Sequence, residues 1–549
     1  MQAKTLLVAL VVSAAVCPSS WAQGPAPLTP EIMVDDGSNA GERALPAVAF
    51  GSDGGFLVVW RLTITNIEQR IMARRFFENG SPNGAIFRVD GFTGSKNFPA
   101  VAALPGGNYV VAWEEGVASV TPGTDTSGSS VRARIYGGPG SEFQVNTTTN
   151  LNQGRPAVAA MSNGNFVIAW QSDSSGGTDQ SSTSIQMQRY SASGTPLGSE
   201  FQVNTSTAGG QISPAVAAGA GGFVVAWPSH VSETDLDYNV KARRFDASGG
   251  PLGNDFQVNT YATGWQISPS LAVGSTNDFF IVWKSGEFSL PGPDGSNSSI
   301  QGRRYDAGGA PLGDEFQINT HYIDLQGDPA IARDVDGDFV VLWFDSVETG
   351  DSAFLPGCVR GQRFNIDGSR RGTEFRANTF IPNAQDTPDL AIGAGGDFLA
   401  VWRSIGQGVT GDPTIMGRLF SGSQALALDL DFHTLAPCRV VDTRSGAPLA
   451  SDSLRTFPIA GVCGIPATAK SIAANVAVVG PTGDGYIKLW PADLPETATS
   501  VINFSSGMIR ANNSLASLAT DASGGLSAKA SVGAGGSVHL VIDVTGYFE

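Results

Sequence analysis

The residues best suited to ligand chemistry lie in loops whose sequence varies along the chain. Aromatic rings stand beside carboxylates there, and a ring can stack on the apolar face of a sugar while a carboxylate accepts hydrogen bonds from its hydroxyl groups. We therefore predict a ligand site formed by Asp235, Asp237, Tyr238, Tyr261, Trp265, Asp294, His321, Tyr322 and Asp345. The alternative is that these rings hold long loops onto the strands beneath them.

Motifs for catalysis are sparse. The chain has no His-Glu-x-x-His, no cysteine pair at zinc spacing and no Gly-x-Ser-x-Gly, so metal-dependent and serine hydrolase activities are disfavoured. A glycosidase needs only two carboxyl groups about 5 to 10 Å apart, and the loops contain too many acids to exclude one. No catalytic residue is predicted.

One segment has the alternating oxygens of a calcium loop. Asp334-Val-Asp-Gly-Asp338 lacks the rest of the twelve-residue spacing and the terminal glutamate of such a loop. Other copies of the repeat have Gly-Gly or Asn-Gly at this place, which favours a structural turn. We predict no metal and no cofactor, with weak calcium binding as the open alternative.

The elements that position these loops follow from a repeat. Seven times between residues 46 and 402 the chain has a Pro-Ala-Val-Ala-like phrase, a Gly-rich gap and a Phe-Val-Val-x-Trp-like phrase. The closing tryptophans are Trp60, Trp113, Trp170, Trp227, Trp283, Trp343 and Trp402, which lie 53 to 60 residues apart. A fixed period of this size indicates one supersecondary unit copied in series.

Each period contains four short runs with strand character, which matches a propeller blade. The first run is Ala- and Val-rich, as suits a crowded inner strand. The second is apolar on both faces, and the fourth alternates as an outer strand does. Residues 31–36 align with the fourth run and would complete the last blade, closing the ring and removing its exposed edges. We predict an all-β fold with a seven-bladed β-propeller over residues 23–425; a linear solenoid is the alternative.

The N-terminus and the composition indicate export. Residues 1–22 have Lys4, an apolar run and a Ser-Trp-Ala end, which is typical of a secretory signal peptide. No other stretch is long and apolar enough to span a membrane. The net charge is -17, which argues against nucleic acid or an anionic membrane as a partner. We predict a secreted or cell-surface protein with an extracellular glycan or protein partner.

The repeat ends near residue 421, and residues 426–549 predict a separate C-terminal β-sandwich of short strands divided by Pro, Gly and Asn. Cys438 and Cys463 lie 25 residues apart there, and we expect them to form a disulfide in an oxidising compartment.

This C-terminal unit resembles a module found at the end of secreted bacterial proteins. The resemblance rests on Phe432-His-Thr-Leu-Ala-Pro-Cys-Arg-Val-Val-Asp-Thr-Arg444, on Arg510-Ala-Asn-Asn513 and on His539-Leu-Val-Ile-Asp-Val-Thr-Gly-Tyr-Phe548. It implies a bacterial, exported setting and no particular activity. The propeller part resembles other secreted bacterial repeat proteins that share the Phe-Val-Val-x-Trp phrase.

The repeat also separates scaffold residues from ligand residues, because a residue present in every copy serves the blade. Arginines recur on the third run, as at Arg243 and Arg244, and acids recur at the start of the fourth, as at Glu200 and Asp255. We interpret them as ion pairs between neighbouring strands of one blade.

From these features we predict a non-enzymatic binding or adhesion protein that recognises its ligand through the variable loops. The second hypothesis is a polysaccharide-degrading enzyme that uses loop carboxylates. A third is a surface scaffold without a ligand.

Overall fold

The computed structural model divides into two compact units, Met1–Ala425 and Leu426–Glu549. It describes residues 24–37, 41–116, 127–137, 140–173, 179, 182–230, 237–286, 292–295, 297–321, 325–346, 357–380, 382–408, 411–422, 432–494, 496, 500–519, 521 and 523–549. The signal peptide predicted at residues 1–22 lies outside these ranges. Among the described residues, none of the helices has the length and apolar character needed to span a membrane.

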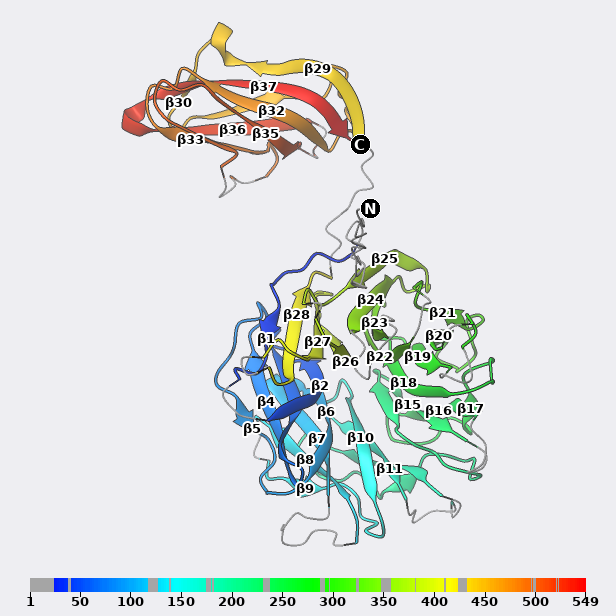
Figure 1. Ribbon diagram of the computed structural model, residues 1–549. Coiled ribbons are helices and arrows are strands. Elements are labelled where there is room, and N and C mark those ends of the chain that lie inside the picture. Colours follow the sequence, from blue (N-terminus) through cyan, green and yellow to red (C-terminus); the bar gives the residue numbers. More distant parts are fainter. Residues whose placement is uncertain are drawn as a thin grey trace, which may run out of the picture. The chain divides into compact units, whose positions relative to one another are not determined.

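In its described residues, the first unit consists of seven antiparallel sheets of four strands each, and we call each sheet a blade (Figure 1). Blades 1 to 6 are β2–β5, β6–β9, β10–β13, β14–β17, β18–β21 and β22–β25, and blade 7 is β26–β28 with β1. All seven first strands line one cavity, so they surround a common axis. The prediction of an all-β propeller protein is confirmed.

Within each blade the strands follow one another from the axis outward. The inner strands are β2 (Glu42–Phe50), β6 (Lys96–Leu104), β10 (Gln153–Ala160), β14 (Ala215–Ala218), β18 (Gln266–Val273), β22 (Gln326–Arg333) and β26 (Gln385–Ile392). The second strands are β3 (Phe56–Thr65), β7 (Asn108–Glu115), β11 (Phe166–Ser172), β15 (Gly222–Ser229), β19 (Phe279–Ser285), β23 (Phe339–Ser346) and β27 (Phe398–Ser404).

The third strands are β4 (Glu68–Phe76), β8 (Ser130–Tyr136), β12 (Ser184–Tyr190), β16 (Asn239–Asp246), β20 (Ser299–Tyr305), β24 (Gly357–Phe364) and β28 (Thr414–Phe420). The outer strands are β5 (Phe87–Arg88), β9 (Phe143–Gln144), β13 (Phe201–Gln202), β17 (Phe256–Gln257), β21 (Phe316–Gln317), β25 (Arg370–Arg376) and β1 (Ile32–Met33). A short 3₁₀ turn, η1 (Pro105–Gly107), joins β6 to β7.

The core of the propeller lies between the blades. Seven hydrophobic clusters each combine residues of two neighbouring blades, and one of them joins blade 7 to blade 1. The seven repeat tryptophans are at most 1% exposed within these clusters. The second strands are apolar on both faces because each is covered by a blade on either side.

Every inner strand bends at the same place. The residue before the repeat proline has a positive φ of 46 to 53° in all seven blades, a conformation that non-glycine residues seldom adopt. The seven residues are Leu45, Phe98, Arg155, Ser213, Ser268, Asp328 and Thr387. Because all copies share this bend, whatever the side chain, it belongs to the blade and not to a particular ligand.

The N-terminal segment supplies the outer strand of blade 7, since β1 pairs antiparallel with β28. Behind it, Asp35 forms a buried ion pair with Arg43 of blade 1. At other seams a neutral pair holds the equivalent positions, such as Asn146 and Gln153, whose side chains hydrogen bond at 2.9 Å. The chain therefore has opposite charges where its first and last blades meet, as it also has at the equivalent Asp90 and Lys96 of blades 1 and 2, whereas the other five seams have two amides.

Our interpretation of the repeated arginines and acids holds for two acids, since Glu142 pairs with Arg132 at 3.0 Å and Glu374 with Arg360 at 3.7 Å within their own blades, but it is wrong for Arg243 and Glu200. Arg243 donates a hydrogen bond to the Val203 carbonyl of the preceding blade at 2.7 Å. Glu200 accepts hydrogen bonds from the amide and hydroxyl of Thr147, also in the preceding blade, at 2.6 Å each. These side chains therefore connect neighbouring blades. Each one contacts the residues that follow the outer strand of the preceding blade.

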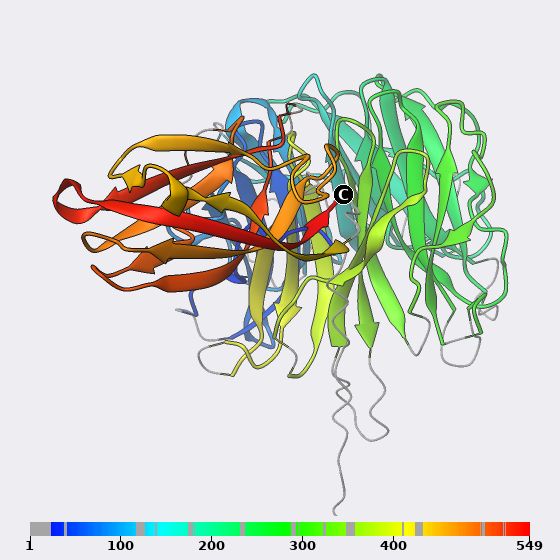
Figure 2. The ribbon, with the colours of Figure 1, turned by 90° about the horizontal axis from the view of Figure 1, so that it is seen from above.

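The second unit has two sheets that share one hydrophobic core, and Figure 2 shows their strands in two layers. One sheet contains β29 (Phe432–Asp442), β37 (Ser537–Phe548), β32 (Ser471–Val479) and β35 (Arg510–Ser517), with β30 (Leu449–Ala450) paired to β37. The other contains β31 (Leu454–Pro458), β36 (Gly525–Val532), β33 (Gly485–Pro491) and β34 (Ile502–Phe504). Two 3₁₀ turns, η2 (Thr443–Ser445) and η3 (Gly533–Gly535), complete this unit.

The predicted disulfide is present, since Cys438 and Cys463 are bonded with a Cα–Cα distance of 6.0 Å. Cys438 lies on β29 and Cys463 on the connection from β31 to β32. The bond therefore fixes that connection to an edge strand of the first sheet.

Candidate active site

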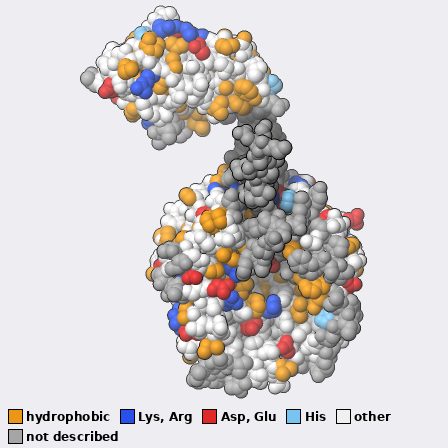
Figure 3. Space-filling view, in the orientation of Figure 1, with side chains coloured by type: hydrophobic (Ala, Val, Ile, Leu, Met, Phe, Trp, Pro, Cys, Tyr) orange, Lys and Arg blue, Asp and Glu red, His pale blue; other side chains and the backbone are white. Residues whose placement is uncertain are grey.

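The seven inner strands enclose a cavity of about 460 Å³ on the propeller axis, which we call the axial channel. Its lining repeats with the blades and consists mainly of proline, alanine and valine. Figure 3 shows basic and acidic side chains around a hollow near the middle of one face of the propeller. Small apolar side chains offer no polar group that could select a ligand. The chemistry of the axial channel therefore depends on the few lining residues that differ from the repeat.

Three charged residues line the axial channel, namely Arg155, Asp328 and Asp389. Asp328 and Asp389 belong to the inner strands of adjacent blades, β22 and β26. Five blades have alanine and one has serine at the position of Asp389, directly after the repeat proline. Two carboxyl groups thus face one small cavity from neighbouring strands.

The Asp389 carboxylate accepts a hydrogen bond from the Val48 amide of blade 1 at 2.9 Å. Burial raises the pKa of Asp389 to about 6, although this hydrogen bond acts in the opposite direction. Desolvation disfavours the charged form of a carboxyl group, so Asp389 takes up a proton just below neutral pH. A carboxyl group in this state can act as a general acid.

Burial also raises the pKa of Asp328, and the negative charge of Asp386 adds to that effect. Lys284 and Arg403 act in the opposite direction. The Asp328 side chain is exposed in the axial channel, which it lines together with Asp389. Asp328 therefore lies within the electrostatic field of one further acid and two bases.

Arg403 forms hydrogen bonds with two carboxylates, those of Asp386 and Glu42. Its guanidinium donates to both oxygens of Asp386, at 2.7 and 2.6 Å, and to Glu42 of blade 1 at 3.2 Å. A bidentate arginine fixes a carboxylate in orientation as well as in charge. The pair joins the start of β26 to the end of β27.

Arg155 occupies the opposite side of the ring, on blade 3. Its guanidinium lies 4.4 Å from the centre of the Phe98 ring, and its backbone amide donates to Glu114 at 3.2 Å. Burial raises the pKa of Glu114. Arg155 is exposed, so it can present a positive charge to a ligand in the channel.

Only some of the site residues that we predicted in the loops come together. Tyr238 contacts Trp265 edge to face at 5.9 Å, and His230 lies 4.9 Å from Tyr238. Asp237 accepts a hydrogen bond from the Gly264 amide at 2.6 Å. Asp237, Tyr238 and Trp265 therefore form one aromatic and acidic cluster at the boundary of blades 4 and 5.

His321 and Asp345 form a separate pair, with His321 Nδ1 and Asp345 Oδ2 3.3 Å apart. Hydrogen bonding to Asp345 raises the pKa of His321. Asp345 is fully buried and also forms an ion pair with Arg360. This carboxylate thus belongs to an internal network of blade 6.

The remaining predicted residues are dispersed. Asp294 accepts a hydrogen bond from Gln317 at 2.9 Å, and the Tyr261 backbone bonds to Glu315 and Asn259. Asp235 and Tyr322 lie outside the described residues. Within the described ranges, no group of three histidine, cysteine or acidic residues could hold a metal ion. Asp334 accepts hydrogen bonds from the Asp336 and Asp338 amides and so closes its own turn.

The acids of the axial channel were missed by sequence reasoning. The signal was present, since Asp328 and Asp389 are departures from the repeat on the inner strand. An Ala- and Val-rich first run is typical of a crowded inner strand, so our sequence analysis placed candidate ligand residues in the variable loops alone.

No protein-family model and no curated protein matches the chain. Among solved structures it is similar to a protein of unknown function from Dyadobacter fermentans, with 10% identity, a TM-score of 0.42 and coverage of 72% of this chain and 98% of that one. An α-L-arabinofuranosidase from Fusarium graminearum has 13% identity, a TM-score of 0.40 and coverage of 59% and 93%. An α-L-arabinanase from Penicillium chrysogenum has 13% identity, a TM-score of 0.39 and coverage of 60% and 94%.

Our prediction of a non-enzymatic binding protein is corrected at this point. The named activities among these similar structures are those of glycoside hydrolases, not of non-enzymatic binding proteins. At these identities and TM-scores the similarity concerns the fold alone. The argument for activity therefore rests on the residues of the axial channel.

Proposed function

We propose that this protein is a secreted glycoside hydrolase whose active site is the axial channel. The observation that carries this proposal is the convergence of Asp328 and Asp389 on one cavity of about 460 Å³. Both carboxyl groups have a raised pKa. A cavity of this volume falls in the usual range for small-molecule sites, so we expect the end of a glycan chain to enter it.

The two acids can divide the work of glycoside hydrolysis. Such enzymes use one protonated carboxyl group to protonate the departing glycosidic oxygen and a second, ionised one on the other side of the bond. We assign the proton donor to Asp389, whose pKa of about 6 keeps a substantial protonated fraction near that pH. Asp328 then removes the proton of the attacking water or attacks the sugar carbon itself.

The surrounding charges position this pair. Arg403 fixes Asp386 through two hydrogen bonds, and the charge of Asp386 acts on Asp328. Asp386 and Arg403 are therefore positioning residues, and Arg155 is suited to bind an electron-rich group of the glycan. The low mobility expected of inner strands favours precise placement of all these side chains.

Export is part of the proposal. The signal-peptide pattern of residues 1–22 and the disulfide between Cys438 and Cys463 both suit an oxidising compartment. Expression of the full chain in a bacterial host tests it. We expect a periplasmic or secreted product whose N-terminus begins near Gln23, and a cytoplasmic product that retains residues 1–22 would contradict this part.

A reducing-sugar assay tests the activity. The purified protein is incubated with a panel of polysaccharides that includes arabinan and galactan, and the released sugars are analysed. We expect hydrolysis by the natural chain and a loss of at least about 100-fold in Asp389→Asn and Asp328→Asn, as for removal of an acid–base catalyst. Asp336→Asn, which changes an exposed acid on a turn of blade 6, is the control and should retain full activity.

A further inference from the structure

The seams between blades follow a second rule, which involves the third strand. At four seams an arginine of one blade donates to a backbone carbonyl at or beyond the end of the next blade's third strand. These pairs are Arg189 with Ala247 at 3.4 Å, Arg244 with Ala307 at 2.6 Å, Arg304 with Asp367, and Arg363 with Gly422. The propeller thus fills these gaps with its own guanidinium groups.

Two other seams have an apolar residue at this position, namely Ile135 at the seam between blades 2 and 3 and Leu419 at the seam between blades 7 and 1. The equivalent position on β28 is Leu419, which pairs with Leu399 as Arg244 pairs with Val224. A leucine side chain cannot donate a hydrogen bond to the facing turn of blade 1. A cavity of about 790 Å³ lies at this seam, which we call the seam cavity.

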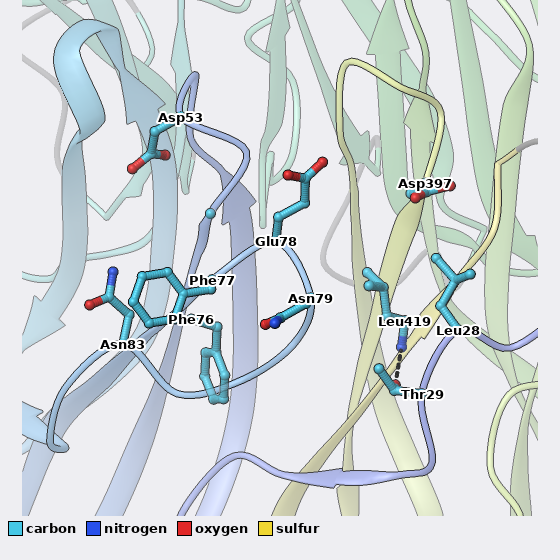
Figure 4. Close-up of a pocket in the computed structure, with 11 residues that line it drawn as sticks. Leu28, Thr29, Asp53, Phe76, Phe77, Glu78, Asn79, Asn83, Asp397 and Leu419 are labelled. Carbon is cyan, nitrogen blue, oxygen red and sulfur yellow. Dashed lines mark hydrogen bonds between the residues drawn. The ribbon is translucent and has the colours of Figure 1, made fainter. Parts of the chain in front are cut away.

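The two sides of the seam cavity carry opposed acids. Figure 4 shows Glu78 on the turn after β4 at one side of the cavity and Asp397 and Leu419 of blade 7 at the other side. Glu78 is exposed, and Asp397 accepts one hydrogen bond from the Gly422 amide at 2.8 Å. Leu28, 48% exposed, and Leu419 provide an apolar surface between the acids.

We propose that the seam cavity binds an arginine side chain presented by a partner protein. The guanidinium would lie between Glu78 and Asp397, where charge-assisted hydrogen bonds are strongest. Its aliphatic stem would cover Leu28 and Leu419, because arginine buries its methylene groups on apolar surface while its charged head stays at the edge. The partner would thereby replace the guanidinium that this chain supplies at four of its other seams.

Binding of N-acetyl-arginine amide to the full-length protein, followed by calorimetry or NMR, tests the proposal. The neutral citrulline analogue has almost the same shape and serves as the matched control ligand. We expect a dissociation constant of about 1 mM for the arginine probe, at least about tenfold weaker binding of citrulline, and weaker arginine binding at high salt.

Two variants locate the site. Leu419→Arg introduces the guanidinium found at the other seams, and we expect it to abolish binding. Glu78→Gln removes one charge from an exposed turn, and we expect roughly tenfold weaker binding. If Leu419→Arg fails to fold, Glu78→Gln alone tests whether the seam cavity binds the probe. Asp336→Asn is the control for the loss of one negative charge elsewhere on the surface and should leave arginine binding unchanged.

Three results would overturn the proposal. One is the absence of saturable binding up to about 20 mM, well above the expected dissociation constant. Another is equal binding of the arginine and citrulline probes. The third is arginine binding that Glu78→Gln leaves unchanged.

Discussion

Replacement of Asp389 by asparagine should stabilise the protein and abolish its activity at the same time. The difference between the ordinary carboxyl pKa of 3.8 and a value of about 6 corresponds to roughly 3 kcal/mol in favour of the protonated group. The ionised carboxylate therefore destabilises the folded state by that amount at neutral pH. Asparagine has the same shape and keeps an oxygen that can accept the Val48 hydrogen bond.

The sign of the pH dependence follows from linkage. Well below pH 3.8 the carboxyl group is protonated in both the folded and the unfolded chain, so it contributes nothing to the difference in stability. As pH rises through 4 to 6, the unfolded chain loses its proton first, and the folded state becomes less stable by up to roughly 3 kcal/mol. Asp389→Asn removes this loss, so the gain in stability should be largest at pH 7 and absent near pH 3.5.

Thermal unfolding of the natural protein and of Asp389→Asn at pH 3.5, 5 and 7 measures this effect. Asp336→Asn controls for the general loss of one negative charge from a protein of net charge -17. The reasoning would be refuted if Asp389→Asn were no more stable than the natural protein at pH 7, or if the gain were the same at every pH. Loss of activity with a gain of stability is the pattern expected of a catalytic acid.

Three further predictions concern the scaffold. Arg43→Gln should lower the free energy of unfolding by about 3 to 5 kcal/mol, because it leaves Asp35 buried without a partner charge. The additional change Asp35→Asn should restore most of that loss. Denaturant unfolding of the single and double variants measures the coupling, and additive losses of stability would contradict it. Replacing Cys438 and Cys463 by serine should destabilise the C-terminal unit by about 3.5 kcal/mol for a loop of 25 residues, visible in calorimetry as a lower transition; an unchanged transition would count against a structural role. Because the pKa of His321 is raised, its stabilisation is present below pH 6.5 and lost as pH rises through the raised value; His321→Gln should therefore lower the melting temperature more at pH 6 than at pH 9, and equal losses would contradict this.

The fold was predictable because its signals are repeated and local. An apolar run ending in tryptophan must be covered on both faces, and seven copies leave few arrangements other than a closed ring. Contacts across the ring were not predictable in the same way. Arg243 and Glu200 are separated from their partners by about 40 and 50 residues, and nothing in a single repeat shows which neighbour they meet.

The candidate site was harder to predict for a different reason. Tyr238 and Trp265 lie in contact because they come from two neighbouring loops. The aromatic residues of these loops had indicated such a cluster. Asp345 carries the same composition signal but lies in a buried ion pair, because loop length and burial are not encoded in residue type. Asp389 has a raised pKa only because seven strands converge around it, and that convergence exists only in the folded ring.

A crystal structure of Asp389→Asn soaked with an oligosaccharide that the natural protein hydrolyses tests the central claim most directly. We predict a sugar in the axial channel, with its scissile oxygen within hydrogen-bonding distance of residue 389 and its ring beside Asp328. A sugar bound at the cluster of Tyr238 and Trp265, with the channel unchanged, would contradict the assignment of the active site.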